Sequence, residues 1–394
     1  MRSALRVLVL CCLPACLAWD KDGHEAIGMT AMSALKGKPT AQIKRLMNGR
    51  DVVDVPTWTA KVNKKFPWTL KLHSNPTKDW ECKLDPKPSA DLCPGNVCLL
   101  PAIKHFFGKL THKLTPEQEA ENDLTLPPGQ KLSDSDMLHF LIHLLGELHQ
   151  PLQLGFVGDE TGKKISVHFR GKDSTLFDLW DAGFTQAMIA DRPGHWYGGW
   201  THVNAVKAQY EKEKAEFSKG NEVALFDQWA QENLEIACNK IYKDPTSNDR
   251  ITPAKKLTVT PHIDRQWEEL VRNRILVAGA RTAIVLNSIL ESREAMQMKK
   301  ESGMGVEDNE EVQQRKKTRQ ADTVSLYARN FAINFVIMLV VLAVFFFVNH
   351  VMSGHSAGSA FSAAAQFAKK KMEDAKETYE MSAAGSVKET HRGR

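Results

Sequence analysis

Apolar residues recur at helical spacing in three long stretches of the chain. The first runs from Asp136 to Leu148, the second from Phe226 to Ile241 and the third from Gln266 to Leu290. Spacings of three and four residues place these side chains on one helical face, which must be buried against another element. Ser133 or Ser135 is a candidate N-cap for the first stretch. We therefore expect an all-α, mainly helical fold.

Signals for strands are few by comparison. Only the stretch from Lys164 to Phe169 alternates between polar and apolar residues, as a half-buried strand does. The stretch from Asn75 to Cys98 is rich in Pro and Lys, has no periodicity and is expected to be a loop.

The first residues have the composition of a secretory signal peptide. Arg2 and Arg6 precede an apolar run that ends at the small-residue site Cys16-Leu17-Ala18. This run is shorter than the roughly 20 residues that a membrane-spanning helix needs. We therefore predict cleavage after residue 18, which makes Trp19 the first residue of the mature chain.

A second apolar run, Phe331 to Val348, is long enough for a single transmembrane helix. A lipid-anchor signal is the alternative, but such a tail ends its chain, whereas polar and charged residues 349–394 follow here. The basic residues flanking the run fit the positive-inside rule poorly, so the signal peptide decides the orientation. We predict a protein of the secretory pathway or cell surface, with its body luminal or extracellular.

These features divide the chain into five segments. They are a signal peptide at 1–18, a folded domain at 19–295, a charged stalk at 296–330, a transmembrane helix at 331–349 and a cytosolic tail at 350–394. The formal net charge of +5 is small for 394 residues, so charge alone does not indicate nucleic-acid binding.

Four of the seven cysteines remain once the signal peptide is removed: Cys82, Cys93, Cys98 and Cys238. An even number in an oxidising compartment favours two disulfides, which four cysteines can form in three ways. A zinc site is the alternative, but Cys93 and Cys98 lack the two-residue gap of a zinc-binding pair. The pairing stays open at this point.

Several residues that can bind metal stand along the predicted domain. His143 and Glu147 are four residues apart in the best predicted helix, so both side chains lie on one face. His24, His73 and Asp181 are further candidates. A helical His beside a Glu is more often an ordinary polar pair than a metal site, so the spacing alone decides nothing.

Six ordered motifs give these residues a context. Trp19-Asp-Lys-Asp-Gly-His24 resembles the opening Trp-Gly-x-x-Gly-His of the class I nucleases, the zinc-dependent single-strand-specific nucleases and 3'-nucleotidases. The stretch from Phe140 to Leu152 resembles their Phe-Leu-x-His-x-x-Gly-Asp-x-His-Gln-Pro-Leu. Four more matches follow in the family's order, at Gly162 to Phe169, Leu179 to Asp181, Trp229 to Cys238 and Ala278 to Asn287.

The resemblance implies a fold, a reaction and a disulfide pattern. The family fold is mainly helical with a small β-hairpin, and zinc phospholipases C share it. Three zinc ions, held by His, carboxylates and the N-terminal Trp, activate water for attack on phosphorus in single-stranded RNA or DNA or in 3'-nucleotides. Signal cleavage is then part of site assembly, because it frees the amine of Trp19. The pairs Cys82 with Cys238 and Cys93 with Cys98 follow from the same resemblance.

The resemblance also implies a set of metal ligands in this chain. The ligands carried over are Trp19, His24, His73, His143, Asp181 and Glu147, the last in place of the family's Asp. Glu147 and Asp181 are also the expected catalytic carboxylates. Three family ligand positions are substituted, by Ala60, Gln153 and Phe177. Replacements that remain open are Asp51 or Asp54 for the missing carboxylate, and His149 or His168 for an imidazole.

These substitutions predict a reduced metal centre. Gln153 and Phe177 leave one metal with Asp181 alone, and zinc prefers about four ligands with nitrogen or sulfur among them. We therefore expect at most two zinc ions and a weak or absent phosphodiesterase activity. The alternative is a catalytically inactive relative that serves as a luminal binding or structural module. Phospholipid remains a further substrate class.

Overall fold

The computed structural model describes residues 19–301, apart from residues 36, 86–88, 193–199, 218 and 220. Residues 1–302 group into one unit and residues 303–394 into another. The predicted signal peptide, transmembrane helix and cytosolic tail lie outside the described residues, as does nearly all of the predicted stalk.

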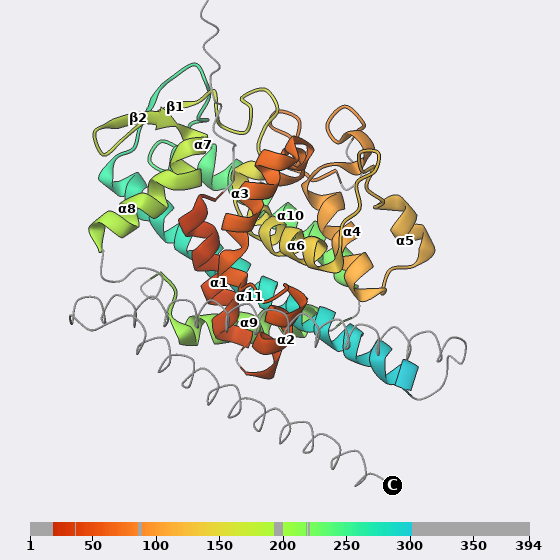
Figure 1. Ribbon diagram of the computed structural model, residues 1–394. Helices are drawn as coiled ribbons and strands as arrows, with labels where there is room; N and C mark the ends of the chain where they lie inside the picture. Colours follow the sequence, from red (N-terminus) through yellow and green to blue (C-terminus); the bar gives the residue numbers. More distant parts are fainter. Residues whose placement is uncertain are drawn as a thin grey trace, which may run out of the picture. The chain divides into compact units, whose positions relative to one another are not determined.

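The described residues form a mainly helical body, as predicted (Figure 1). Its α-helices are α1 (Lys21–Leu35), α2 (Lys38–Leu46), α3 (Val55–Lys65), α4 (Leu99–Thr111), α5 (Pro116–Glu121), α6 (Asp134–Leu148), α7 (Leu176–Asp178), α8 (Phe184–Asp191), α9 (Val203–Phe217), α10 (Glu222–Ile236) and α11 (Pro261–Glu301). Short 3₁₀ or π-helical segments are η1 (Val52–Asp54), η2 (Pro67–His73), η3 (Pro94–Asn96), η4 (Pro151–Leu154), η5 (Leu179–Gly183) and η7 (Ala237–Ile241). The strands are β1 (Ser166–Phe169), β2 (Lys172–Thr175) and β3 (Leu257–Thr258).

The three strands form one small sheet in the order β2-β1-β3. β1 and β2 make the expected antiparallel hairpin, with Ser166 opposite Thr175. β3 adds a parallel strand that the sequence analysis did not predict, with Val167 opposite Leu257. A two-residue strand has no room for alternation, so periodicity could not reveal it.

Helix α6 begins where its cap predicts. Ser133 is the N-cap: its hydroxyl accepts a hydrogen bond from the Asp136 amide at 3.2 Å, and Asp136 accepts one from the Ser133 amide at 3.0 Å. This reciprocal pair satisfies two of the amides that a helix start leaves free. The predicted stretch 136–148 therefore lies within α6, and most side chains of this helix are buried.

The other two predicted helices are also present. The stretch 226–241 corresponds to α10 and the π-helical η7, and the stretch 266–290 lies within α11. Helix α1 packs closely on α11 (Figure 1). Gly279 permits this approach, because a Cβ atom there would overlap the side chain of Thr30.

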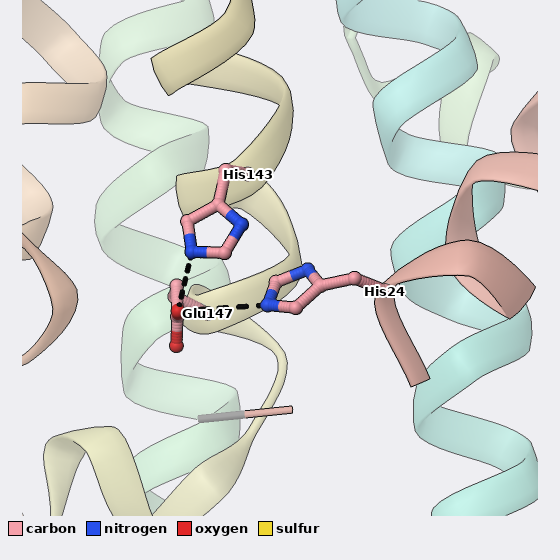
Figure 2. Close-up of side chains that lie close together, drawn as sticks. All are labelled: His24, His143 and Glu147. Carbon is pink, nitrogen blue, oxygen red and sulfur yellow. Dashed lines mark ion pairs between the residues drawn. The ribbon is translucent and has the colours of Figure 1, made fainter. Parts of the chain in front are cut away.

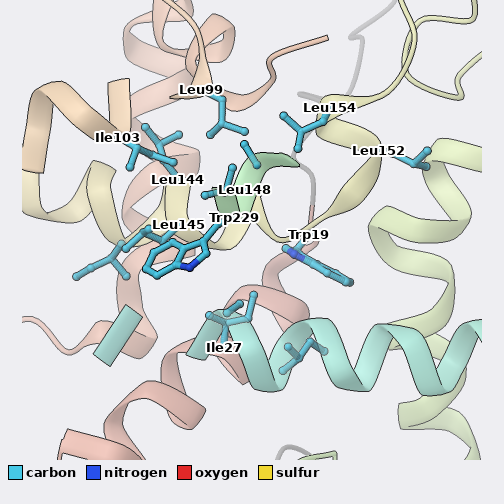
Figure 3. Packing of buried hydrophobic residues seen from close by; sticks show 14 of the residues in the cluster. Trp19, Ile27, Leu99, Ile103, Leu144, Leu145, Leu148, Leu152, Leu154 and Trp229 are labelled. Atoms are coloured by element: carbon cyan, nitrogen blue, oxygen red, sulfur yellow. The ribbon is translucent and has the colours of Figure 1, made fainter. Parts of the chain in front are cut away.

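A single apolar core joins these helices (Figure 3). Leu144, Leu145 and Leu148 of α6 lie in it with Trp229 of α10, and all four side chains are buried. Trp19, the predicted mature N-terminus, is fully buried in the same core. The predicted start of the mature chain is therefore held inside the fold next to α6.

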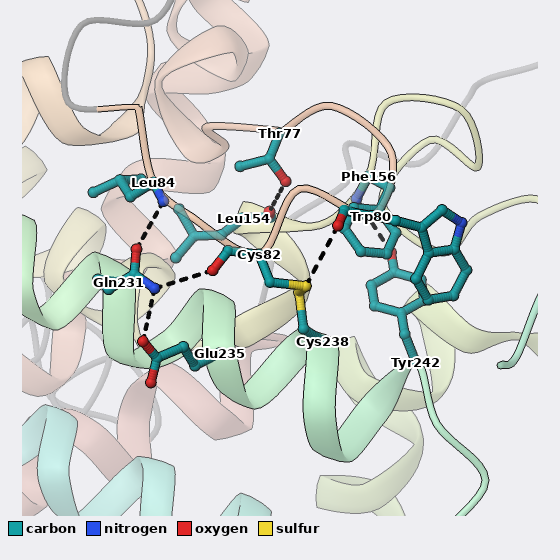
Figure 4. The surroundings of a disulfide bond; sticks show 10 residues. All are labelled: Thr77, Trp80, Cys82, Leu84, Leu154, Phe156, Gln231, Glu235, Cys238 and Tyr242. Atoms are coloured by element: carbon teal, nitrogen blue, oxygen red, sulfur yellow. Dashed lines mark hydrogen bonds between the residues drawn. A yellow bond between two sulfur atoms is a disulfide. The ribbon is translucent and has the colours of Figure 1, made fainter. Parts of the chain in front are cut away.

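Both predicted disulfides are confirmed. Cys82 pairs with Cys238, and Cys93 pairs with Cys98. The first ties the long loop after η2 to the start of η7 (Figure 4). Gln231 of α10 strengthens this link, since its amide nitrogen donates to the Cys82 carbonyl at 3.1 Å and its oxygen accepts from the Leu84 amide at 2.7 Å.

Among the described residues, only α11 is long and apolar enough to span a membrane. However, 83% of its most apolar window is buried inside the fold, which is the placement of a core helix.

Candidate metal centre

Four buried side chains from three parts of the fold meet beside α6. His143 and Glu147 lie one turn apart on α6, His24 comes from the first turn of α1, and His73 is the last residue of η2. All four are at most 5% exposed. The packing of α1, α3 and η2 against α6 therefore brings together the histidines that were predicted from distant motifs.

The Glu147 carboxylate is the centre of this cluster. Its Oε1 lies 2.7 Å from His73 Nδ1, 2.8 Å from His143 Nε2 and 3.5 Å from His24 Nε2. Figure 2 shows the His24 and His143 rings directed at this carboxylate from two different helices. His143 Nε2 and His73 Nδ1 are 3.3 Å apart, a separation that two nitrogen ligands of one zinc ion could also have.

Close packing holds the rings in place. The His24 and His143 rings stack with their centroids 4.0 Å apart. Gly146 makes room for this stack, because a Cβ atom there would lie 2.7 Å from His24 Nδ1. The Trp19 indole donates to the Gly146 carbonyl at 3.0 Å, which holds Trp19 beside the cluster.

Two amide side chains form a second layer around the cluster. Gln153 Nε2 donates to Glu147 Oε2 at 3.1 Å. Asn63 Nδ2 lies 3.2 Å from His73 Nε2, and Thr69 Oγ1 lies 2.6 Å from Asn63 Oδ1. The sequence analysis missed Asn63, because no motif marks it. The one available signal was its place four residues after Thr59 on the buried face of α3.

The Asn63 amide decides which nitrogen of His73 carries the proton. With Nδ2 facing the ring, His73 Nε2 accepts, so Nδ1 carries the proton and donates to Glu147. With Oδ1 facing the ring, the proton moves to Nε2 and Nδ1 has a free lone pair for a metal. Ligating histidines generally donate their second N–H to such an oxygen.

The donor set fits a divalent metal ion. His24, His143 and Glu147 each offer a ligand atom, and these atoms lie within 4.8 Å of one another. Two imidazoles and a carboxylate are the ligand types that zinc takes in catalytic sites. His24 Nε2 and His143 Nδ1 are buried without a hydrogen-bond partner, as is Asp181 Oδ1. Buried polar atoms of this kind are normally satisfied, so the cluster is incomplete as a purely hydrogen-bonded one.

The protonation states suit metal binding as well. Burial lowers the pKa of His143 to about 3, and the charge of His24 acts in the same direction, so the ring is neutral at physiological pH. Burial alone would raise the pKa of Glu147, but the charge of His73 and the hydrogen bond from His143 hold it well below its ordinary value. A neutral imidazole and an ionised carboxylate are the forms that coordinate metal.

Asp181 lies beside this cluster on η5. Its backbone carbonyl accepts a hydrogen bond from the Asp20 amide at 2.9 Å, which joins η5 to the mature N-terminus. Burial raises the pKa of Asp181 to about 8, and the charges of Glu147 and Asp20 add to the effect. Burial likewise raises the pKa of Asp20 to about 6. This side of the centre is therefore short of positive charge.

The three substituted positions have different surroundings. Gln153 is directed at Glu147, as described above, and Phe177 is 2% exposed. Ala60 is exposed on α3, whereas Thr59 and Asn63 are among the residues of that helix that are buried. Asn63, and not Ala60, is the α3 residue that contacts His73.

The alternative ligands named from the sequence have other partners. Asp51 and Asp54 cap η1, each accepting a hydrogen bond from the local backbone. His149 is buried between the Leu145 carbonyl at 2.7 Å and Arg281 Nη1 at 3.1 Å. His168 is paired with an exposed Asp on the hairpin, at 2.6 Å.

The chain is similar to known proteins over most of its length. A family model described as S1/P1 nuclease matches residues 19–291. Endonuclease 3 of Arabidopsis thaliana is 26% identical over 295 residues, which cover 70% of this chain and 90% of that protein. Endonuclease 1 of the same plant is 23% identical, covering 74% of this chain and 93% of that protein. The chain therefore belongs to the S1/P1 nuclease family.

Proposed function

We propose that the protein is a divergent zinc-dependent phosphodiesterase with a reduced metal centre and weak or absent activity. Its substrates are single-stranded RNA or DNA, or 3'-nucleotides. The observation that carries this proposal is the buried convergence of His24, His73 and His143 on Glu147. Family membership supports the reaction class, and the surroundings of Gln153 and Phe177 support the reduced centre.

The proposed ligands divide into a retained part and a depleted part. Trp19, through its free amine in the processed chain, His24 and Glu147 would hold one zinc ion. His73 would hold a second ion together with His143 and Glu147, once the Asn63 oxygen faces His73 Nε2. At most two zinc ions fit this set.

Zinc supplies Lewis-acid stabilisation of the extra phosphoryl charge and lowers the pKa of water. The chain's own residues prepare that chemistry. Burial keeps His143 neutral, so its ring nitrogen is available as a ligand, and Glu147 stays ionised among the three imidazoles. Asp181 lies beside the cluster, but burial raises its pKa to about 8, so it becomes a carboxylate ligand only when a cation binds next to it. Burial of the whole group limits access of bulk water, which strengthens each of these interactions.

A catalytically inactive binding module is the second candidate. The observation in its favour is that the Glu147 carboxylate already accepts hydrogen bonds from His73, His143 and the Gln153 amide. The Glu147 carboxylate is therefore satisfied without any metal, and the helical body could persist as a luminal module.

Zinc analysis with a hydrolysis assay tests the proposal. We expect the purified, signal-processed protein to hold one or two zinc ions per chain. It should cleave a single-stranded oligonucleotide slowly and lose that cleavage on chelation and in His143→Gln. The exposed variant Ala60→Ser is the control and should match wild type. Three bound zinc ions with rapid cleavage would show a complete centre, and no cleavage at full zinc loading would favour the inactive module.

A further inference from the structure

Lys163 brings a positive charge to the depleted side of the metal centre. Its Nζ lies 4.7 Å from the centroid of the Phe177 ring, an ordinary cation–π distance. Phe177 stands at a substituted ligand position, and Asp181 follows one helical turn later, on the same face. The ammonium group therefore lies beside the residues where an imidazole-bound metal is no longer expected.

The turn that carries Lys163 is tightly held. Glu160, Thr161 and Gly162 all have positive φ angles, which L residues rarely adopt in succession. Asp159 stabilises this conformation, because its Oδ1 accepts from the Gly162 amide at 2.7 Å and from the Tyr242 hydroxyl at 3.1 Å. The Phe177 amide donates to the Gly162 carbonyl at 3.3 Å. The position of Lys163 relative to Phe177 is therefore built into the fold.

The neighbouring Lys164 differs in its contacts. Lys164 Nζ is paired with Glu160 at 3.1 Å and donates to the Gly158 carbonyl at 3.2 Å. Lys163 is half-buried and makes no ion pair with any residue in the described part of the chain. A half-buried ammonium group without a carboxylate partner is available to an anionic ligand.

The Phe177 contact lies close to the rest of the centre. Asp181, one turn after Phe177, is joined to the residue after Trp19, because its backbone carbonyl accepts a hydrogen bond from the Asp20 amide at 2.9 Å. A phosphoryl group bound at this side of the centre would meet the charge of Lys163.

We propose that Lys163 is a phosphate-binding residue of this centre. With Gln153 and Phe177 at two predicted ligand positions, no metal ion is expected there, and the Lys163 ammonium group supplies part of the positive charge that such an ion would bring. The proposal rests on the proposed function, since it places a phosphoryl group there. Lysine binds phosphate as a point charge, so one ammonium group can bind it without the paired hydrogen bonds that arginine forms.

Phosphate binding by the full-length protein tests this role. Titration calorimetry with inorganic phosphate, and separately with a single-stranded oligothymidylate, would compare wild type with Lys163→Gln, Lys163→Arg and Lys164→Gln. We expect Lys163→Gln to weaken phosphate binding about tenfold, because charged hydrogen bonds are among the stronger ones. Lys163→Arg should stay near wild type, and Lys164→Gln is the matched control that should not change affinity.

Zinc content and thermal unfolding of each variant show whether the centre and the fold are intact. Weaker binding of either ligand by Lys163→Gln, at unchanged zinc content, supports the proposal and identifies whether free phosphate or a phosphodiester is bound. Equal affinities in wild type and Lys163→Gln for both ligands overturn it, as does a wild type that binds neither. A protein that binds phosphate through Lys163 but hydrolyses nothing would favour the catalytically inactive module as the function and would still support this role of Lys163.

Discussion

Gln153 Nε2 donates to Glu147 Oε2 at 3.1 Å, so the side chain that we predict to replace a family ligand is bonded to the central carboxylate. An amide can satisfy a carboxylate oxygen, but it offers no imidazole nitrogen to a metal. This hydrogen bond therefore uses the Glu147 Oε2 atom, which would otherwise be available to a second metal ion. Substitutions that restore imidazoles on this side of the centre should therefore change the amount of bound zinc.

The double variant Gln153→His and Phe177→His should increase the bound zinc by about one ion per chain. Two imidazoles together with Asp181 recreate a nitrogen-rich ligand set, and zinc rarely stays with a single oxygen ligand. Inductively coupled plasma mass spectrometry of the purified protein measures the gain. Gln153→His alone is the control and should gain little. An unchanged zinc content in the double variant would mean that the backbone no longer places these positions around one ion.

Asn63→Asp should tighten zinc binding about tenfold, because a carboxylate at this position accepts the His73 Nε2 proton and leaves Nδ1 free for the metal. Ala60→Asp puts the same carboxylate three residues earlier, on the exposed side of α3, and should change little. Competition with a chromogenic chelator gives both affinities. A larger gain in zinc affinity in Ala60→Asp than in Asn63→Asp would contradict the observed orientation of α3.

Glu232 should make the free energy of unfolding depend on pH in the acid range. Burial opposes its ionisation, but the charges of Arg281 and Arg274 outweigh burial and lower the pKa of Glu232 to about 2. As pH falls, Glu232 is therefore protonated in the unfolded chain before it is protonated in the folded one. The stabilisation is present above the ordinary pKa of 4.5 and is lost as pH falls toward 2.

Urea unfolding between pH 6 and pH 2.5 measures this effect. Glu232→Gln should flatten the decline in unfolding free energy by about 1–2 kcal/mol, a value reduced for solvent screening of a side chain that is 37% exposed. Glu235→Gln, on the exposed side of the same helix, is the control. Equal declines in wild type and Glu232→Gln would remove Glu232 from the explanation.

The two disulfides should contribute unequally. Cys82 and Cys238 are 156 residues apart, and closing that loop restricts the unfolded chain by about 5 kcal/mol on the chain-entropy estimate. Cys93 and Cys98 are 5 residues apart, for which the same estimate is about 2 kcal/mol. Cys238→Ala should therefore reduce the secreted yield more than Cys93→Ala in pulse-chase labelling. The opposite order would count against a dominant role for the long loop.

The membrane topology is a proposal that rests on the signal peptide and on the apolar run Phe331 to Val348. Protease added to intact microsomes should remove only the tail after about residue 350 and leave the disulfide-bonded body protected. Detergent should then expose the body to cleavage. Loss of the body with survival of the tail would reverse the orientation.

Much of the helical fold could be predicted because its signals are local. The cap at Ser133 and the apolar spacing of 136–148 located α6, and the spacing of His143 and Glu147 placed both on one of its faces. β3 escaped prediction because its two residues gain their strand conformation only by pairing with β1.

Sequence motifs were enough to predict that His24, His73 and His143 belong to one site with Glu147, and the structure brings these four side chains together. Their distances could not be predicted, because they depend on how α1 and η2 pack against α6. Asn63 and Ala60 show the same limit: successive residues of a helix are rotated by about 100°, so spacing from a motif does not tell which face meets His73. Likewise, Lys163 is an ordinary basic residue in the sequence. Only the folded turn brings its ammonium group over Phe177, since that contact joins a residue before the hairpin to one after it.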